Sequence, residues 1–133
     1  MRVKDIMNPV IYKIDENKPL KDILKTMKNE GIKRVFVENS NNKIIGVVSY
    51  RDLVDLLMTM SMLELLNISN NIGSIAKKEI LKINQNEDII EGAKIMVHGD
   101  VSALLVVDDN DNPVGVLSQT DLLRSIIKGS KDK

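Results

Sequence analysis

Short apolar runs and polar breaks alternate along the first half of the chain. The runs VIYKI (10–14), RVFVE (34–38) and KIIGVVS (43–49) are rich in β-branched residues, which predicts three β-strands. The last two runs are separated only by NSNN (39–42), whose residues are typical of a turn. We therefore expect the second and third strands to be joined by a tight connection.

Helical spacing occupies the stretches around these strands. Between the first two runs, apolar residues recur three and four positions apart, and Gly31 follows as a stop signal; the residues are Leu20, Ile23, Leu24 and Met27. After the third run, YRDLVDLLM (50–58) returns to the same spacing. The first half therefore predicts the order β-α-β-β-α, a sheet covered by amphipathic helices.

The second half repeats the first without a gap. Gly115 in GVLSQTD lies 69 positions after Gly46 in GVVSYRD (115 − 46 = 69), and the same offset relates many identical pairs: Ile6/Ile75, Ile11/Ile80, Lys13/Lys82, Ile14/Ile83, Asn17/Asn86, Lys25/Lys94, Met27/Met96, Val37/Val106, Asn41/Asn110, Ser49/Ser118, Asp52/Asp121 and Leu53/Leu122. A repeat of this length is a whole supersecondary unit. We expect an α/β (α+β) fold of two β-α-β-β-α repeats related by a pseudo-two-fold.

This pattern also predicts the organisation of the chain. We expect the first repeat over residues 1–60, a helical linker over 61–71, the second repeat over 72–129 and a tail over 130–133.

The segment LVDLLMTMSMLELLNIS (53–69) carries more apolar side chains than one helix face can bury. It predicts one helix, or two helices broken near Ser61. It either seals the two repeats together or forms a dimer interface in which methionines supply adaptable packing, and the two roles are compatible.

Composition excludes several classes of function. The formal net charge is zero and aromatic residues make up only 2%, so neither a basic stripe nor a stacking platform for nucleic acid is expected. Cysteine is absent, which removes disulfides and thiolate zinc sites. No apolar run is long enough to span a membrane, and MRVKDIMNPV (1–10) lacks the apolar core of a signal peptide. We expect a cytoplasmic protein without membrane association.

Two superficial metal and catalytic signals fail. DDNDNP (108–113) spaces Asp108, Asn110 and Asn112 two apart, as in a calcium loop, but Pro113 stands where glycine is needed and Gln119 where glutamate is needed. A hairpin turn is predicted instead. His98 is the only histidine, and with no cysteine a nucleophile–base pair is not evident. We therefore expect a protein that has no metal site, requires no cofactor and is not an enzyme.

The repeated Ser-x-x-Asp ending has a structural and a functional interpretation. Ser49 and Ser118 stand where a strand ends and a helix begins, and Asp52 and Asp121 follow at the third helical position, which is close to a capping box. The same strand-to-helix turn aims N–H groups at an anion, and a carboxylate there accepts hydrogen bonds from the vicinal hydroxyls of a ribose. Both interpretations remain open from the sequence.

The order of these features resembles a known family. The element order, DIM (5–7), GIKRVFV (31–37) and the doubled G-x-x-S-x-x-D resemble a tandem pair of cystathionine-β-synthase (CBS) domains, or Bateman module, over residues 1–60 and 70–129. The resemblance implies a regulatory protein that binds an adenosine-containing ligand of the AMP, ADP or ATP class, or S-adenosylmethionine or NAD, in clefts between the repeats. It also implies dimerisation, here through the apolar helices around 53–69 and 119–128.

The resemblance assigns roles to individual residues. Asp52 and Asp121 match the ribose-binding carboxylate, and Ser49 and Ser118 match the neighbouring hydroxyl. Further nucleotide-binding candidates are the basic residues Lys33, Arg34, Arg51, Lys13 and Lys82. For the two strand lysines, an ordinary solvated position is the alternative.

The two sites differ in charge. In the second repeat, Ser102, Ala103 and Thr120 replace Lys33, Arg34 and Arg51. We therefore expect unequal occupancy by charged nucleotides. The adenine would lie among aliphatic residues that are otherwise core candidates: Ile11, Ile32, Val47, Val48, Ile80, Val101, Val116 and Leu117.

Two functional hypotheses follow. The first is a stand-alone module that senses an adenine nucleotide and relays its binding to an unknown effector protein. The second is a dimerising interaction scaffold without ligand binding, which the methionine-rich segment 53–69 favours.

Overall fold

The chain divides into two compact units, and neither of them coincides with one sequence repeat. The computed structural model describes residues 1–61, residue 72 and residues 76–131. The first-repeat unit comprises Tyr12–Ile80, and the second-repeat unit comprises Met1–Ile11 together with Leu81–Lys133. The N-terminal segment therefore belongs with the second repeat.

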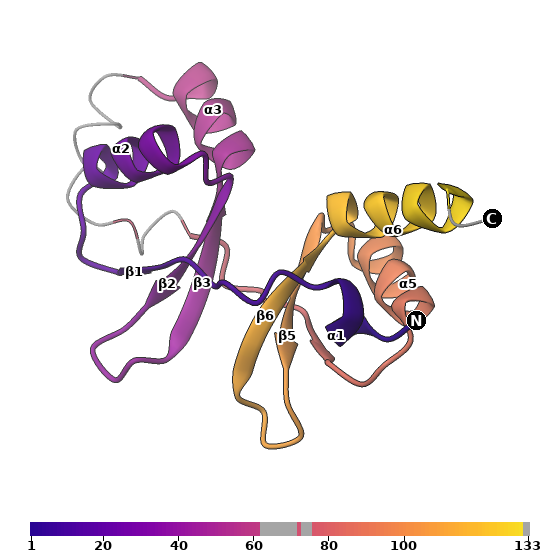
Figure 1. Ribbon diagram of the computed structural model, residues 1–133. Coiled ribbons are helices and arrows are strands. Elements are labelled where there is room, and N and C mark those ends of the chain that lie inside the picture. Colours follow the sequence, from indigo (N-terminus) through magenta and orange to yellow (C-terminus); the bar gives the residue numbers. More distant parts are fainter. Residues whose placement is uncertain (62–71, 73–75, 132–133) are drawn as a thin grey trace. The chain divides into compact units, whose positions relative to one another are not determined.

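The first-repeat unit is a three-stranded sheet with helices packed on it (Figure 1). Its elements are β1 (Lys13–Asp15), α2 (Leu20–Glu30), β2 (Arg34–Glu38), β3 (Ile44–Ser49) and α3 (Tyr50–Thr59). The strand order is β1-β2-β3, with β1 parallel to β2 and β2 antiparallel to β3. Each element lies where the apolar periodicity predicts one.

The second-repeat unit has the same plan. Its elements are α1 (Val3–Ile6), β4 (Lys82–Asn84), α5 (Ile89–Gly99), β5 (Ala103–Val107), β6 (Pro113–Ser118) and α6 (Gln119–Lys131). The order β4-β5-β6 and its pairing directions match the first sheet, down to a register shift in the same place, at Val106/Val107 here and Val37/Glu38 there. The predicted mixed fold and its element order are confirmed.

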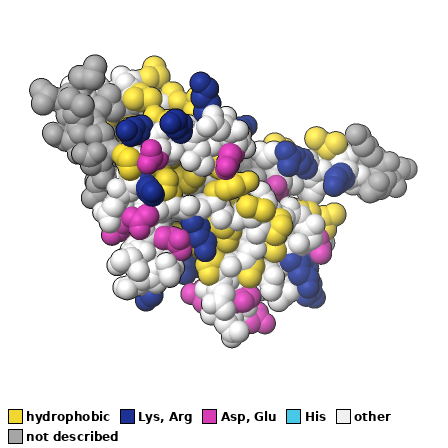
Figure 2. Space-filling view, turned by 60° about the vertical axis from the view of Figure 1, so that its left-hand side comes forward, with side chains coloured by type: hydrophobic (Ala, Val, Ile, Leu, Met, Phe, Trp, Pro, Cys, Tyr) yellow, Lys and Arg dark blue, Asp and Glu magenta, His cyan; other side chains and the backbone are white. Residues whose placement is uncertain are grey.

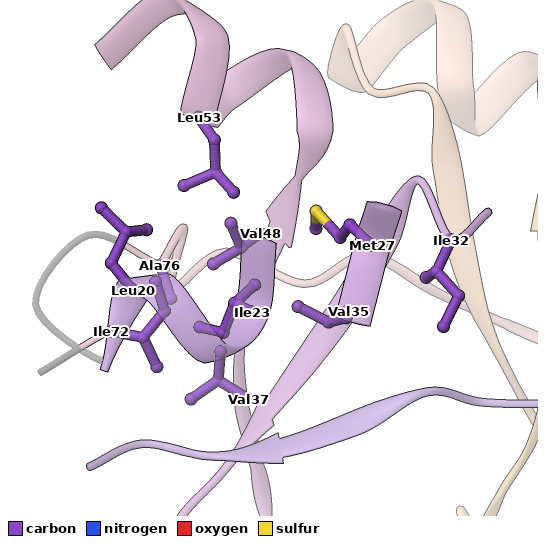
Figure 3. Close-up of a cluster of buried hydrophobic side chains, with 10 residues drawn as sticks. All are labelled: Leu20, Ile23, Met27, Ile32, Val35, Val37, Val48, Leu53, Ile72 and Ala76. Carbon is purple, nitrogen blue, oxygen red and sulfur yellow. The ribbon is translucent and has the colours of Figure 1, made fainter. Parts of the chain in front are cut away.

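A core on one face of each sheet holds the elements together. In the first-repeat unit, Ile23 and Met27 of α2 pack on β2 and β3, and Leu53 of α3 closes the same layer (Figure 3). This cluster of buried residues comprises Leu20, Ile23, Met27, Ile32, Val35, Val37, Val48, Leu53, Ile72 and Ala76. The corresponding cluster of the second-repeat unit comprises Val3, Ile83, Met96, Leu104, Val106 and Leu117.

The first strand of each repeat is shorter than predicted, because the chain changes sheets there. Asn8 pairs with Val116 of β6, whereas Lys13 pairs with Phe36 of β2. Residues between them cannot belong to one continuous strand, so β1 begins only at Lys13. In the second repeat the equivalent pair is Lys77 with Val47, and β4 begins at Lys82.

Residues 7–8 and 76–77 each begin one repeat but pair with the sheet of the other, and we call them the exchanged segments. Both segments lie against glycines. A Cβ built on Gly46 would lie 2.8 Å from Ala76 Cβ and 3.1 Å from the Lys77 carbonyl oxygen. A Cβ on Gly115 would lie 2.7 Å from the Asn8 carbonyl oxygen and 2.8 Å from Met7 Sδ. The two repeated glycines are therefore positions of close backbone approach.

Helix α3 ends at Thr59, and its cap residue Met60 has extended dihedral angles. A single helix over 53–69 is therefore excluded; the rest of that segment, and most of the predicted linker, lie outside the described residues. Helix α6 continues to Lys131, through the start of the predicted tail.

Charge is mixed on the molecular surface. On the face seen in Figure 2, Lys and Arg side chains lie among Asp and Glu side chains instead of forming a continuous basic stripe. Within the described ranges, no helix is both long and apolar enough to cross a membrane.

We predict that Gly115→Ala and Gly46→Ala each destabilise the protein by about 1–3 kcal/mol. The new methyl group would overlap the Asn8 carbonyl oxygen at position 115 and the Ala76 Cβ at position 46. Urea unfolding followed by circular dichroism measures this change. Gly129→Ala is the matched control, since nothing lies within 4 Å of its Cβ position in α6, and alanine favours a helix interior. Equal stability of all three variants would contradict the close-approach interpretation.

Candidate functional site

Each sheet passes into a helix through a capping box formed by the repeated Ser-x-x-Asp sequence. Ser49 is the N-cap of α3: its Oγ accepts a hydrogen bond from Asp52 N at 3.0 Å, and Asp52 Oδ2 accepts one from Ser49 N at 3.3 Å. These bonds satisfy backbone donors that a helix N-terminus otherwise leaves unpaired. The structural interpretation of the motif is confirmed here.

The second repeat has the same arrangement. Ser118 Oγ accepts from Asp121 N at 3.2 Å, and Asp121 Oδ2 accepts from Ser118 N at 2.9 Å and from Ser118 Oγ at 3.0 Å. Both carboxylates are only half-buried, so capping does not remove them from solvent. A capping role and a ligand-binding role therefore remain compatible.

The first carboxylate also has a cationic partner that the sequence analysis missed. Lys77 Nζ lies 3.3 Å from Asp52 Oδ1. Lys77 is 25 residues away along the chain, and the exchanged segment brings it to the strand-to-helix turn. The repeat offset of 69 aligns Lys77 with Asn8 and Lys78 with Pro9, and these two charge differences were the signal in the sequence.

These contacts shift the ionisation of Asp52. Partial burial works against the charged form, but the hydrogen bonds from the Ser49 side chain and backbone and the proximity of Lys77 outweigh it, so the pKa of Asp52 lies below its ordinary value of 3.8. The carboxylate is therefore ionised throughout the neutral range.

Strand pairing brings the basic candidates of the first repeat to the same turn. Arg34 is the register partner of Ser49, and the Lys33 carbonyl accepts a hydrogen bond from Tyr50 N at 2.8 Å. Arg51 is exposed in the first turn of α3. In the second repeat, Ala103 and Ser102 hold the equivalent backbone positions.

The two strand lysines form ion pairs elsewhere in the sheets. Lys13 Nζ lies 3.7 Å from Glu38 Oε2, and Lys82 Nζ lies 3.3 Å from Asp111 Oδ2. Glu38 and Asp111 are at the hairpin ends of their sheets, opposite the capping boxes. In this structure both lysine side chains therefore pair with acidic residues at the hairpin end of their sheet.

The apolar candidates divide into two groups. Ile32, Val48 and Leu117 are buried, which agrees with their alternative prediction as core residues. The others are half-buried: Ile11, Val47, Ile80, Val101 and Val116. Only the second group keeps surface that a ligand can contact.

The acidic loop is a hairpin turn, as predicted. Asp108 Oδ1 accepts hydrogen bonds from Asn110 N and Asn112 N, both at 2.9 Å, and these bonds lower the pKa of Asp108. Among the residues that the structure describes, no group of three or more His, Cys, Asp or Glu is placed to hold a metal ion. His98 is exposed in the last turn of α5.

Comparison with known proteins decides the family. The sequence profile of the CBS domain matches residues 3–59 and again residues 72–128. The chain belongs to the CBS domain family. Its two CBS repeats coincide with the two sheet-and-helix patterns described above.

Relatives of this CBS pair are found in distant organisms. An uncharacterized protein of Methanocaldococcus jannaschii is 27% identical over 126 residues, covering 95% of this chain and 40% of the relative. A CBS domain-containing protein of Dictyostelium discoideum is 28% identical, covering 95% and 91%. The chain spans 40%, 27% and 51% of the lengths of three Methanocaldococcus relatives.

Solved structures share the fold of the CBS pair. A CBS domain protein of unknown function from Thermoplasma acidophilum has a TM-score of 0.78 at 25% identity, covering 93% of this chain and 68% of that one. CBSX2, solved in complex with AMP, has a TM-score of 0.80 at 20% identity, covering 97% and 98%. The CBS pair of protein MJ0100, solved with 5′-methylthioadenosine and S-adenosyl-L-methionine, has a TM-score of 0.80 at 21% identity, covering 98% of each chain.

We predict a pH-dependent cost for Asp52→Asn. Because the folded-state pKa of Asp52 is depressed, the charged group stabilises the protein above its ordinary pKa, and this contribution is lost as pH falls through the folded-state value. The variant is expected to be less stable by on the order of 1 kcal/mol at neutral pH and equal to wild type in strong acid.

Urea unfolding of both proteins across the acid range measures this difference. Groups other than Asp52 titrate alike in the two proteins, so the difference isolates this carboxylate. A stability gap that stays constant with pH would show that the charge of Asp52 contributes nothing.

Proposed function

We propose that this CBS pair is a regulatory module that binds an adenosine-containing ligand of the AMP, ADP or ATP class and relays its binding to an effector protein. The observation that carries the proposal is the doubled strand-to-helix turn with an ionisable Asp, in a chain of the CBS family. Structural neighbours solved with AMP and with S-adenosyl-L-methionine support the choice of ligand class.

The carboxylates suit ribose recognition. Within the described part of the chain, the hydrogen bonds that Ser118 donates to Asp121 use Oδ2, so Oδ1 is oriented elsewhere and can accept from vicinal hydroxyls. In the first repeat, the hydroxyls would compete with Lys77 for Asp52 Oδ1. A hydrogen bond from a ribose hydroxyl to an ionised carboxylate is stronger than one between two neutral groups. The ionised Asp side chains therefore favour a ligand that carries ribose hydroxyls.

The two sites differ in their affinity for phosphate. Lys33, Arg34 and Arg51 surround the turn of the first repeat, and uncharged residues replace them in the second. A helix N-terminus with added cations favours an anion. The first site therefore takes the more highly charged nucleotide, and the second accepts a ligand with fewer phosphates.

Regulation follows from differential binding. A ligand that favours one arrangement of the chain or of its complex shifts the population toward that arrangement. We assign no catalytic step to the chain, and its effect on an effector is a change of affinity.

Calorimetric titration of nucleotide-stripped protein tests the proposal against AMP, ADP, ATP, S-adenosylmethionine and NAD. We expect binding of at least one ligand, weakened about tenfold or more by Asp52→Ala at the first site and by Asp121→Ala at the second. Asp55→Ala is the control for Asp52→Ala, because it removes one exposed carboxylate from the same helix. If the folded protein binds none of these ligands, the proposed sensor function is overturned.

A second candidate, the self-associating scaffold, is favoured by a surface that both repeats leave uncovered. On α6, Leu123, Ile126 and Ile127 are 61%, 66% and 56% exposed and lie on one helix face. The repeat offset of 69 aligns Ile126 and Ile127 with Leu57 and Met58 of α3, which are 47% and 81% exposed. Since these positions are apolar and exposed in both repeats, we propose that they pack against a second copy of this chain.

We predict that wild type sediments as a dimer and that Ile126→Lys weakens association at least tenfold, because it buries a charge at the interface. Analytical ultracentrifugation over a concentration series measures this. The control is Val97→Lys on α5, where the residue is 79% exposed outside this face. A monomer at every concentration would eliminate the self-association.

A further inference from the structure

The backbone of the exchanged segment holds Lys77 firmly beside β3. Lys77 N donates to the Val47 carbonyl at 3.0 Å, and Val47 N donates to the Lys77 carbonyl at 3.0 Å. Gly46 permits this approach, since a Cβ there would overlap Ala76. Val47 is two residues before Ser49, so the bridge fixes the base of the Lys77 side chain close to the capping box of α3.

The equivalent position in the second repeat has the same backbone and a different side chain. Asn8 N donates to the Val116 carbonyl at 2.9 Å, and Val116 N donates to the Asn8 carbonyl at 2.8 Å. Asn8 Oδ1, however, accepts a hydrogen bond from Val10 N at 3.0 Å and so turns back on its own segment. The same backbone arrangement therefore places a cation beside Asp52 in the first repeat. In the second repeat this position supplies no cation to Asp121.

We propose that Lys77 is a specificity-determining residue of the Asp52 site, which makes that site prefer phosphorylated over unphosphorylated adenosine ligands. The inference rests on the proposed function, because it concerns the ligand of the same site. Lys77 is absent from the residues that the family resemblance assigned.

The ion pair is suited to an exchange of partners. The Lys77 side chain is 69% exposed and that of Asp52 28% exposed, so solvent screens the pair and the ammonium group moves at little cost. When ribose hydroxyls bind Asp52, the ammonium group pairs with the ligand phosphate. Each charged group then exchanges one partner for another, and neither is left unpaired.

An unphosphorylated ligand does not allow this exchange. The hydroxyls of adenosine displace Lys77 from Asp52 without offering the ammonium group an anion. Lys33, Arg34 and Arg51 also contribute cations near this turn, so removal of Lys77 reduces the preference without abolishing it.

Calorimetry with AMP and adenosine tests the proposal at one site at a time. In an Asp121→Ala background, Lys77→Asn is expected to weaken AMP binding about tenfold and not to weaken adenosine binding, because adenosine then no longer competes with Lys77 for Asp52. Asparagine is the residue of the second repeat at this position, so the backbone bridge is preserved. Lys43→Asn is the charge-matched control, since Lys43 precedes β3 at its opposite end.

The reciprocal variant provides an independent readout. In an Asp52→Ala background, Asn8→Lys is expected to strengthen AMP binding at the second site several-fold over adenosine. Equal effects on both ligands, or no effect, would overturn the role of Lys77 while leaving the sensor function intact. Wild-type protein that binds neither ligand would overturn the sensor function, and with it the role of Lys77.

Discussion

The structure depends on a reciprocal pairing between short segments and the edge strands of the sheets. β3 and β6 are edge strands, whose backbone groups need partners, and Lys77 and Asn8 supply them at Val47 and Val116. The repeated glycines make room for this contact. Because each of these segments opens one repeat and pairs with the sheet of the other, neither compact unit corresponds to one repeat alone.

The same pairing explains how one carboxylate can serve both fold and function. Asp52 Oδ2 caps α3, which fixes the side chain in one rotamer at the end of the sheet. The other oxygen, Oδ1, is directed at Lys77 and remains partly exposed. A group whose position is fixed by a structural bond is preorganised for a ligand, so the capping role supports the proposed ribose contact.

The two repeats share a backbone and differ in the side chains that it carries. The hairpin turns, the register shift and the ends of α2 and α5 coincide: Gly31 and Asp100 close these two helices with positive φ angles of 65° and 52°. Charge, in contrast, is concentrated on the first repeat at the strand-to-helix turn. The two strand-to-helix turns therefore share one backbone geometry and differ in the charges around them.

The sequence by itself determined the repeat, the order of elements and the capping boxes, because these depend on local periodicity and on residues three positions apart. The family resemblance named Lys33 and Arg34 as candidates for the same site as Ser49, and in the structure the β2–β3 register places Arg34 opposite Ser49. Only the tertiary structure decided that Lys13 and Lys82 pair with acids at the hairpin ends and that Lys77 reaches Asp52. Those contacts depend on which sheet the segment before each repeat joins, and no local pattern in the sequence specifies that long-range choice.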